Sequence, residues 1–458
     1  MQNPGIDEKK VHFIGIGGIS MSGLAMILMT WGIPVSGSDR TDSPVLERLR
    51  KLGADIYVGQ KAGQHSGASL VVYTPAIAGD DEELAAARAS GVPVIRRDEL
   101  LGRIIRQYKQ SIGISGVHGK TTCTSMTSTI LFKCGRNPTI HIGGNLPLIG
   151  GSIRVGGSDI FVTEADEYKE SFLAFPPTIA VILNIDADHL DYYRDIEHIT
   201  GSFAKYVSLL PDDGYCIVNG DDARAVQILR GAHCGGTTFG LTESCDWRAS
   251  DIAPGENGCF GFTLTHKGEP CGHVELCVPG RHNVMNALAA IAASVHCGVE
   301  VHCAIDCLKD FKGAERRFQK VGEAGGAAVY HDYAHHPTEL RATLEAADVL
   351  PHKRLWCVFQ PHTYTRTKAL FGDFVKAFEK ADRVVLLDIY AAREPDPGDI
   401  HSRMLCDAVN ARFGDNRCVY AASFKEAAEL VKAGRKPGDL IFAVGAGDVE
   451  KLGGMLVG

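Results

Sequence analysis

The chain has 458 residues, of which 45% are hydrophobic and 22% charged, a composition typical of a globular protein with two to four domains of about 150 residues. Its 55 acidic residues outnumber its 47 basic ones, and the net charge of −8 argues against a nucleic-acid partner, which requires a basic face. The sequence shows no apolar run of about 18 residues and no signal peptide. We therefore expect a cytoplasmic protein without membrane insertion.

The 14 cysteines are scattered along the chain, and no C-x-x-C pair occurs. Cys303 and Cys307 are spaced as a pair on one helix, but no second pair of ligands accompanies them. Buried thiols in a reducing compartment are therefore expected rather than a metal site.

Residues 11–110 alternate short β-branched runs with helical stretches, which predicts a parallel sheet with crossover helices. The first turn, GIGGISMSG, is followed by Asp39 at the end of the next strand, where a dinucleotide-binding fold places an acidic ribose contact. Ser20 replaces the third glycine of G-x-G-x-x-G. The motif thus fits NAD, another pyrophosphate ligand on a helix N-terminus, or a turn that needs glycine only for packing.

The segment SIGISGVHGKTTCTSMTSTIL, residues 111–131, places a glycine turn between an apolar strand and a helix. Backbone N–H groups, Lys120 and Thr121 are what a triphosphate and its metal ion require. Ile114 stands where G-x-x-x-x-G-K-[ST] has its first glycine, so the loop is shorter than the common one. G-K-T-T in this context still favours nucleotide binding, with ATP or GTP undecided.

Acidic segments follow the next two predicted strands, 159–163 and 179–185. Because the carboxyl ends of strands form the ligand-binding edge of an open α/β sheet, these side chains should lie beside the phosphate loop. Carboxylates and an imidazole there suit Mg²⁺, although a solvated acidic loop with helix caps is the alternative. The polar side chains at this edge are Glu164, Asp166, Glu167, Asp186, Asp188, His189 and Asp191.

Short alternating runs from Thr237 to Val278 predict an antiparallel β insertion. The helix NVMNALAAIAASV follows. Asn283 and Asn286 lie one turn apart and could face a purine, though a capping role for Asn283 is equally consistent with the spacing.

A third α/β region begins near Phe311, with strands predicted at 327–331 and 440–444 and a helix from Pro337. Its polar residues would form a rim suited to anionic substrates and to the oxyanion of an acyl transfer. Adjacent histidines in an extended loop point apart, which disfavours zinc. With no nucleophilic triad evident, the chemistry implied is phosphoryl transfer to a substrate group. The rim residues are Arg316, Arg317, His331, Asp332, Tyr333, His335, His336, His362, Tyr364, Arg366, Arg393 and Glu394.

Taken in order, the motifs GIGGISMSGLA, GVHGKTT, HIGGNLP, EADEY, NIDADHLD, GRHNVMNALAA, GAERRF, DYAHHPTE and FQPHTYTRT resemble the Mur ligases of bacterial cell-wall synthesis over nearly the whole chain. The last two motifs favour the member that adds alanine. The resemblance implies an α/β fold with three domains: a Rossmann-like UDP-sugar-binding domain (1–109), a central P-loop ATPase domain with a mainly parallel sheet (110–312), and a C-terminal Rossmann-like domain (313–458) that binds the amino acid and closes over the others.

The resemblance also implies a reaction, in which ATP and Mg²⁺ phosphorylate the lactyl carboxylate of UDP-N-acetylmuramate and the amine of L-alanine attacks the acyl phosphate. The product is a peptidoglycan precursor. A recycling ligase that attaches a peptide to the same sugar nucleotide, and a nucleotide-dependent sensor without catalysis, are the alternatives, and a nicotinamide dehydrogenase is the poorest one. A homo-oligomer is compatible with the sequence.

Site residues follow from the same resemblance. The UDP-sugar contacts are Gly15, Gly17, Gly18, Ser22 and Asp39. The ATP contacts are Gly116, Val117, His118, Gly119, Lys120, Thr121, Thr122, Asn283, Asn286, Arg317 and Asp332. The metal ligands are Thr121, Glu164 and His189. The amino-acid contacts are Tyr333, His335 and Arg366. The catalytic residues are Lys120, His335 and Arg366, with His335 assisting the loss of a proton from the ammonium group. Thr363 departs from the family pattern, because some members have arginine there.

Overall fold

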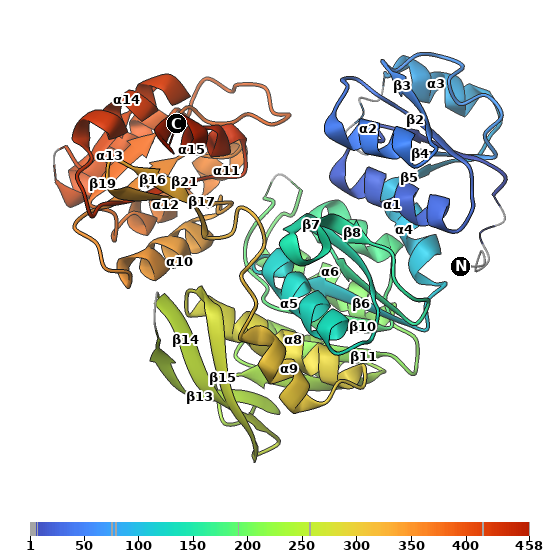
Figure 1. Cartoon of the computed structure of the whole chain (residues 1–458), viewed down its shortest axis with the longest axis horizontal. Helices are drawn as coiled ribbons and strands as arrows, with labels where there is room; N and C mark the ends of the chain where they lie inside the picture. Colours follow the sequence, from blue (N-terminus) through green and yellow to red (C-terminus); the bar gives the residue numbers. More distant parts are fainter. Residues whose placement is uncertain are drawn as a thin grey trace.

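The computed structural model describes residues 6, 8–74, 77, 80–190, 192–255, 258–414 and 416–457. Asp191 lies outside these residues. Three β-sheets, each covered by helices, form three lobes (Figure 1). The first and third lobes lie at the two ends of the long axis, and the second lies between them.

The first sheet is parallel throughout, with the strand order β3-β2-β1-β4-β5. This is the order of a Rossmann fold, so the prediction for residues 11–110 is confirmed. β1 is buried along its whole length, because helices cover both faces of a parallel sheet. The strands are β1 (Val11–Ile14), β2 (Val35–Asp39), β3 (Asp55–Val58), β4 (Leu70–Tyr73) and β5 (Val94–Arg96), and the helices are α1 (Ile19–Thr30), α2 (Pro44–Lys51), α3 (Glu82–Ala89) and α4 (Arg97–Ile105).

The second sheet has ten strands in the order β15-β14-β13-β12-β11-β10-β6-β9-β7-β8. Its strands are β6 (Gln110–Ser115), β7 (Thr139–Leu146), β8 (Gly151–Arg154), β9 (Ile160–Glu164), β10 (Ile179–Ile182), β11 (Tyr215–Asn219), β12 (Gly235–Gly240), β13 (Trp247–Pro254), β14 (Cys259–His266) and β15 (Glu269–Pro279). Its helices are α5 (Lys120–Lys133), α6 (Ile196–Ser208), α7 (Ala223–Arg230), α8 (His282–His296) and α9 (Val301–Leu308), and the short 3₁₀ helices η1 (Pro147–Ile149) and η2 (Tyr168–Ala174) complete this lobe.

The predicted antiparallel insertion is only partly correct. β14 is antiparallel to both of its neighbours, β13 and β15. β12 is parallel to both β11 and β13, so these strands extend the main sheet instead of forming a separate unit. Alternation within a strand reports which face is buried but not which strand it pairs with.

The third sheet has the order β16-β17-β21-β18-β19-β20, and only the edge pair β16–β17 is antiparallel. Its strands are β16 (Gln319–Ala324), β17 (Ala327–Asp332), β18 (Leu355–Phe359), β19 (Arg383–Leu386), β20 (Cys418–Tyr420) and β21 (Leu440–Val444). Its helices are α10 (Pro337–Asp348), α11 (Tyr364–Ala369), α12 (Phe371–Ala377), α13 (Ser402–Phe413), α14 (Phe424–Gly434), the 3₁₀ helix η4 (Asp448–Glu450) and α15 (Lys451–Val457). The three sheets fall within the three predicted domain ranges, and the exact boundaries stay a prediction.

The expectation that the cysteines are all thiols is wrong, because Cys134 forms a disulfide with Cys303. Cys134 directly follows α5, whereas Cys303 lies on α9, 169 residues further along the chain. A pairing at that separation depends on how two helices pack, which the spacing of cysteines does not reveal. Among the described residues, no helix combines the length and the apolar character needed to cross a bilayer.

Candidate active site

The turn between β6 and α5 is a phosphate-type loop built on two glycines. Gly116 has φ +135° and Gly119 has φ +88°, a region that side chains other than glycine rarely adopt. A Cβ atom on Gly119 would also lie 2.5 Å from Asn286 Oδ1. The loop is fixed on its other side by Asn184, whose amide accepts from His118 N and donates to His118 O, both at 2.9 Å.

Lys120 opens α5 and faces the acidic edge of the sheet. Its Nζ lies 2.7 Å from Glu167 Oε2 and 2.8 Å from the carbonyl oxygen of Gly116. Burial alone would lower the pKa of Lys120, but the carboxylates of Glu167, Asp166 and Glu164 outweigh it and raise the pKa. Lys120 is therefore a permanent cation beside the loop.

Two of the three predicted metal ligands lie next to each other. The hydroxyl of Thr121 donates to Glu164 Oε2 at 3.2 Å, and Gly143 N donates to Glu164 Oε1 at 2.8 Å. Burial raises the pKa of Glu164, against the lowering effects of Gly143 and Lys120. A buried carboxylate of this kind gains from a nearby divalent cation.

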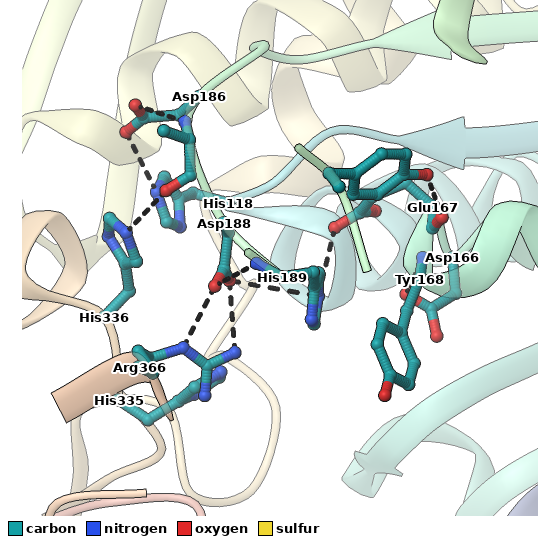
Figure 2. Close-up of polar contacts among 12 residues, drawn as sticks. His118, Asp166, Glu167, Tyr168, Asp186, Asp188, His189, His335, His336 and Arg366 are labelled. Carbon is teal, nitrogen blue, oxygen red and sulfur yellow. Dashed lines mark hydrogen bonds and ion pairs between the residues drawn. The ribbon is translucent and has the colours of Figure 1, made fainter. Parts of the chain in front are cut away.

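The third predicted ligand, His189, lies beside two carboxylates of the acidic edge. Its Nε2 lies 3.7 Å from Glu167 Oε1 and 3.9 Å from Asp188 Oδ2, as Figure 2 shows. One oxygen or nitrogen each from Asp166, Glu167 and His189 falls within 4.8 Å of the others. His189 has φ +52°, a strained conformation that often marks a functional position.

The acidic edge can hold a hard divalent cation. It offers the hydroxyl of Thr121 and the carboxylates of Glu164, Asp166 and Glu167 within one lobe, and Mg²⁺ prefers a few oxygen ligands plus phosphate oxygens. Burial raises the pKa of Glu167, whose carboxylate Lys120 and His189 help to keep ionised. The donor set therefore fits Mg²⁺, and which of these groups bind it stays a prediction.

Next to the loop lies a cavity of about 380 Å³. The predicted asparagines lie on its wall: Asn283 Nδ2 donates to Pro279 O at 2.7 Å, and Asn286 Nδ2 donates to Asn283 Oδ1 at 2.9 Å. Asn283 thus secures the start of α8 and still faces the cavity. The predicted nucleotide contacts that line it are His118, Gly119, Thr122, Asn283, Asn286, Arg317 and Asp332.

Asp332 ends β17 and lies on the far wall of the same cavity. Its oxygens accept N–H groups from Phe318 and Ala334, both at 2.8 Å. Burial raises the pKa of this carboxyl, opposed by the charge of Arg317. Asp332 therefore shapes the loop that carries Arg317, whose guanidinium lies 5.2 Å from the ring centroid of Tyr333.

A second cavity, of about 810 Å³, lies on the other side of the loop. Its wall comes from all three lobes, and it shares Gly119, Arg317 and Glu339 with the first cavity. The predicted site residues on its wall are Val117, Gly119, Lys120, Thr121, Glu164, His189, Arg317, Tyr333 and His335. Gly116 lines neither cavity, because it lies at the back of the loop against Leu183.

The amino-acid contacts predicted from the resemblance line a third cavity, also of about 810 Å³. It shares Asp166, Asp188, His189, Tyr333 and His335 with the second. Arg366 also lines it and is bound to Asp188, with Nε at 3.0 Å from Oδ1 (Figure 2). Burial would raise the pKa of Asp188, but His189 and Arg366 lower it well below its usual value.

His335 is held as a neutral imidazole. Its Nδ1 lies 3.1 Å from the carbonyl oxygen of Tyr333, and since a carbonyl only accepts, Nδ1 carries the proton and Nε2 is an acceptor. Burial lowers the pKa of His335 to about 3, despite the opposing charge of Glu339. The side chain can accept a hydrogen bond from an amine, but its basicity is weak.

Thr363 departs from the family pattern and has a structural role here. It caps α11, accepting from Arg366 N at 3.4 Å, and its φ is +68°. The adjacent histidines separate as expected, since the Nε2 of His336 faces Ala187 O at 3.3 Å while His335 faces Tyr333.

His118 joins the phosphate loop to the third lobe. Its Nδ1 lies 3.2 Å from Glu339 Oε1 on α10, and its Nε2 lies 3.4 Å from Asp186 Oδ2. Burial would lower the pKa of His118, but the two carboxylates raise it to about 9. At neutral pH the loop is thus tied by charge to the lobe that carries His335 and Arg366.

In the turn predicted to bind the sugar nucleotide, the acidic side chain bonds to the turn itself. Gly15 has φ +83°, and Gly17 N donates to Asp39 Oδ2 at 2.8 Å, so the carboxylate stabilises the turn itself. Ser22 is buried and donates to Ile19 O at 3.0 Å. In the described part of the chain, the second cavity reaches α1 through Ile19 and Ser20. The roles of Gly15, Gly17, Gly18, Ser22 and Asp39 toward a ligand stay predictions.

Three family models cover most of the sequence. The model described as Mur ligase middle domain matches residues 114–294, the Mur ligase family catalytic domain matches 10–109, and the Mur ligase glutamate ligase domain matches 316–447. This chain belongs to the Mur ligase family. It is an enzyme of the ligase class, as the resemblance implied.

Curated relatives of this Mur ligase share about half of its residues. A UDP-N-acetylmuramate--L-alanine ligase of Caldanaerobacter subterraneus subsp. tengcongensis is 47% identical over 97% of this chain and 96% of its own length. One from Acetivibrio thermocellus is 48% identical over 98% of this chain and 96% of its own.

Solved structures agree with the fold. UDP-N-acetylmuramate-alanine ligase MurC of Thermotoga maritima aligns with a TM-score of 0.82 at 27% identity, covering 98% of both chains. A murein peptide ligase of Psychrobacter arcticus aligns with a TM-score of 0.73 at 25% identity, again covering 98% of both. The predicted α/β class, mainly parallel in all three sheets, is therefore confirmed.

Three residues that were not among the assigned site residues of this Mur ligase are central to the site, although Glu167 was expected at the acidic edge. Glu167 holds Lys120, and Asn184 holds the loop. Glu339 is a third, because it connects His118 to the C-terminal lobe. The position of Glu167 at the end of a predicted strand was a usable signal, whereas the capping glutamate on α10 offered none.

Proposed function

We propose that this Mur ligase joins L-alanine to the lactyl carboxylate of UDP-N-acetylmuramate, at the expense of ATP and through an acyl phosphate, in peptidoglycan precursor synthesis. One observation carries the proposal: Lys120 and the carboxylates around it lie where an adenine-sized cavity and a substrate cavity shared by all three lobes meet. The names of the relatives at 47% and 48% identity support the choice of alanine.

In this proposal each cavity receives one substrate. The cavity beside Asn283 and Asn286 takes the adenine, and the loop from Gly116 to Thr122 binds the phosphates through backbone N–H groups and the α5 N-terminus. The second cavity takes the sugar acid, whose nucleotide end reaches the first lobe at Gly15, Gly17, Gly18, Ser22 and Asp39. The third cavity takes L-alanine, beside Tyr333, His335 and Arg366.

The chemical problem is that a carboxylate cannot lose an oxide ion to an attacking amine. Transfer of the γ-phosphoryl group makes a good leaving group, and catalysis of that transfer is mainly electrostatic. Lys120 lies beside the transferred group, and Arg317 approaches the same loop from the third lobe. When bound at Thr121, Glu164 and the His189 cluster, Mg²⁺ would neutralise charge on the phosphate oxygens.

The amine must also be positioned and lose a proton. The acceptor nitrogen of His335 can orient the ammonium group of alanine, and the carboxylate of Asp188 lies on the same wall. Arg366 supplies positive charge for the alanine carboxylate or for the oxyanion of the tetrahedral intermediate. Its bond to Asp188 holds the guanidinium in place before the substrates arrive.

The test is an ADP-release assay with each substrate omitted in turn. ADP should form only when UDP-N-acetylmuramate and L-alanine are both present, and glycine or L-serine should be poorer. Faster ADP release with a tripeptide than with L-alanine would identify a recycling ligase instead. Binding of ATP and the sugar nucleotide without ADP release under any condition would indicate a sensor and contradict the proposal.

A further inference from the structure

A cluster of three sulfur atoms lies far from the proposed substrate cavities, at the other end of the phosphate-loop helix. Cys134 is the residue after α5, and it is disulfide-bonded to Cys303 in the first turn of α9. Cys307, one turn further along α9, places its Sγ 3.6 Å from that of Cys134. One sulfur of each residue falls within 4.8 Å of the others.

The positions of the three sulfurs give them different chemistry. Cys303 lies at the N-terminal end of an eight-residue helix, where the helix dipole favours the thiolate. Cys307 lies at the other end of α9 and is buried, and burial raises the pKa of its thiol. In the reduced protein Cys303 is thus the nucleophile, while Cys307 stays protonated with its S–H beside Cys134.

Small molecules can reach two of the sulfurs. Cys134 and Cys303 are half-buried, whereas Cys307 is buried. By contrast, Cys123 and Cys297 are buried, and burial raises the pKa of each to about 12. Accessible, helix-assisted thiols react with oxidants, and deeply buried neutral thiols do not.

We propose that Cys134, Cys303 and Cys307 form an oxidation site for peroxides, which fastens the far end of the phosphate-loop helix to α9. The thiolate of Cys303 attacks one peroxide oxygen, the O–O bond breaks, and hydroxide leaves and takes up a proton as water. The sulfur of Cys134 then attacks the sulfenic sulfur, and the S–O bond breaks with loss of a second water that carries the proton of Cys134. Two electrons pass from the sulfurs to the peroxide.

Cys307 gives the site a second closed form. Its sulfur can attack Cys134, which forms a Cys134–Cys307 bond and releases Cys303, to which the proton of Cys307 passes. A thiol at 3.6 Å from the disulfide is close enough for this exchange.

The disulfide should restrict α5, which begins with Lys120 and Thr121. It closes a loop between residues 169 apart, and such cross-links stabilise mainly by limiting the unfolded chain. The neighbouring ion pair of Lys133 with Asp310, at 3.0 Å, is partly exposed and contributes little by itself. Oxidation should therefore raise the Tm by roughly 5 °C or more.

The test uses the full-length protein, fully reduced, desalted without air and treated with one equivalent of hydrogen peroxide. Non-reducing peptide mapping should find the Cys134–Cys303 peptide before any other cross-link. The Tm should rise, and amide exchange in α5 should slow. Cross-linking first at another pair, or an unchanged Tm, would overturn the proposal.

Three variants sharpen the result. Cys303→Ser should abolish the rise in Tm given by the Cys134–Cys303 bond while keeping ADP release in the reduced state, and Cys271→Ser, which removes a half-buried cysteine on β15, should behave like wild type. In peroxide-treated wild type, a Cys134–Cys307 peptide should appear after the Cys134–Cys303 peptide and should be absent from Cys307→Ser. Its absence from wild type would refute the role of Cys307. Stoichiometric zinc retained by the reduced wild type and lost in Cys303→Ser would make the cluster a metal site and overturn the proposal.

Discussion

Two glycine turns of this chain connect a buried parallel strand to a helix, and they have different chemistry. In the first lobe, Gly17 N is bonded to Asp39, and both Gly15 N and Ile16 N donate to Ser38 O. These three N–H groups of the turn are thus hydrogen-bonded to residues of β2. In the second lobe, the turn before α5 is followed by Lys120, with Glu167 at 2.7 Å.

The difference shows that a glycine turn provides a backbone frame and that later strands decide its chemistry. The carboxylates near Lys120 come from the ends of β9 and from the segment after it. Arg317 and Glu339 come from the third lobe. In the turn of the first lobe, the carboxylate of Asp39 accepts from Gly17 N and so stabilises the turn itself.

The largest effect is expected for Lys120→Met. This change removes the permanent cation beside the transferred phosphoryl group, so kcat for ADP release should fall about 10²–10³-fold. Lys133→Met, at the other end of α5, is the matched control and should retain wild-type kcat. A Lys120→Met enzyme with normal turnover would show that the second turn is no more catalytic than the first.

The charge that ties the second turn to the third lobe should appear in the pH dependence of stability. The folded pKa of His118 is raised from 6.5 to about 9, so its contribution is complete below pH 6.5 and is lost as pH rises toward 9. At its full value it amounts to about 3 kcal/mol. Calorimetric Tm values from pH 6 to 10 should fall less steeply in His118→Gln than in wild type.

Glu339→Gln is the companion variant, because it removes one carboxylate partner of His118 and leaves the imidazole in place. In Glu339→Gln the fall in Tm between pH 6 and 10 should be smaller than in wild type but larger than in His118→Gln. Identical Tm profiles for wild type and both variants would contradict the tie between the loop and α10.

A matched pair of glycine substitutions compares the two turns directly. Gly119→Ala combines a φ of +88° with a Cβ placed 2.5 Å from Asn286 Oδ1, and such strain costs about 1–3 kcal/mol. We expect a KM for ATP at least about tenfold higher. Gly17→Ala, whose Cβ would lie 2.7 Å from Asp39 Oδ2, should raise the KM for the sugar nucleotide only. If each substitution raised both KM values equally, the two turns could not be assigned to different substrates.

The smallest effect is expected at Asp39. Asp39→Ala leaves the N–H of Gly17 without its side-chain acceptor, which costs about 1 kcal/mol. The KM for UDP-N-acetylmuramate should rise by roughly fivefold, with the KM for ATP unchanged. Asp39→Asn keeps an acceptor oxygen and should be close to wild type. A large loss in Asp39→Asn would instead favour the predicted direct ribose contact.

Local patterns predicted much of this structure. The bounds expected for the strand at 440–444 are those observed, as β21. The helix expected from Pro337 begins at that residue, because proline suits the first position of a helix. The phosphate loop and its lysine were visible because their chemistry depends on adjacent residues.

Contacts between distant segments were not predicted. The disulfide of Cys134 with Cys303, the parallel pairing of β12 with β13, and the contact of His118 with Glu339 all join segments whose proximity depends on packing. Hydrophobic periodicity records the buried face of an element but not its neighbour. The approach of His189 Nε2 to Glu167 Oε1, at 3.7 Å, was likewise not predicted.

The amino-acid sequence by itself determined the three α/β regions and the two glycine turns, and it supplied the residues proposed to bind phosphate and a metal ion, because backbone geometry and side-chain type are local properties. Only the tertiary structure decided which charges meet. The carboxylates beside His118 raise its pKa and keep it a cation, whereas burial lowers the pKa of His335 and keeps it a neutral acceptor. The interaction energy of two charged groups changes steeply with the distance between them and with their burial. Both the distance and the burial are set only when the lobes pack together.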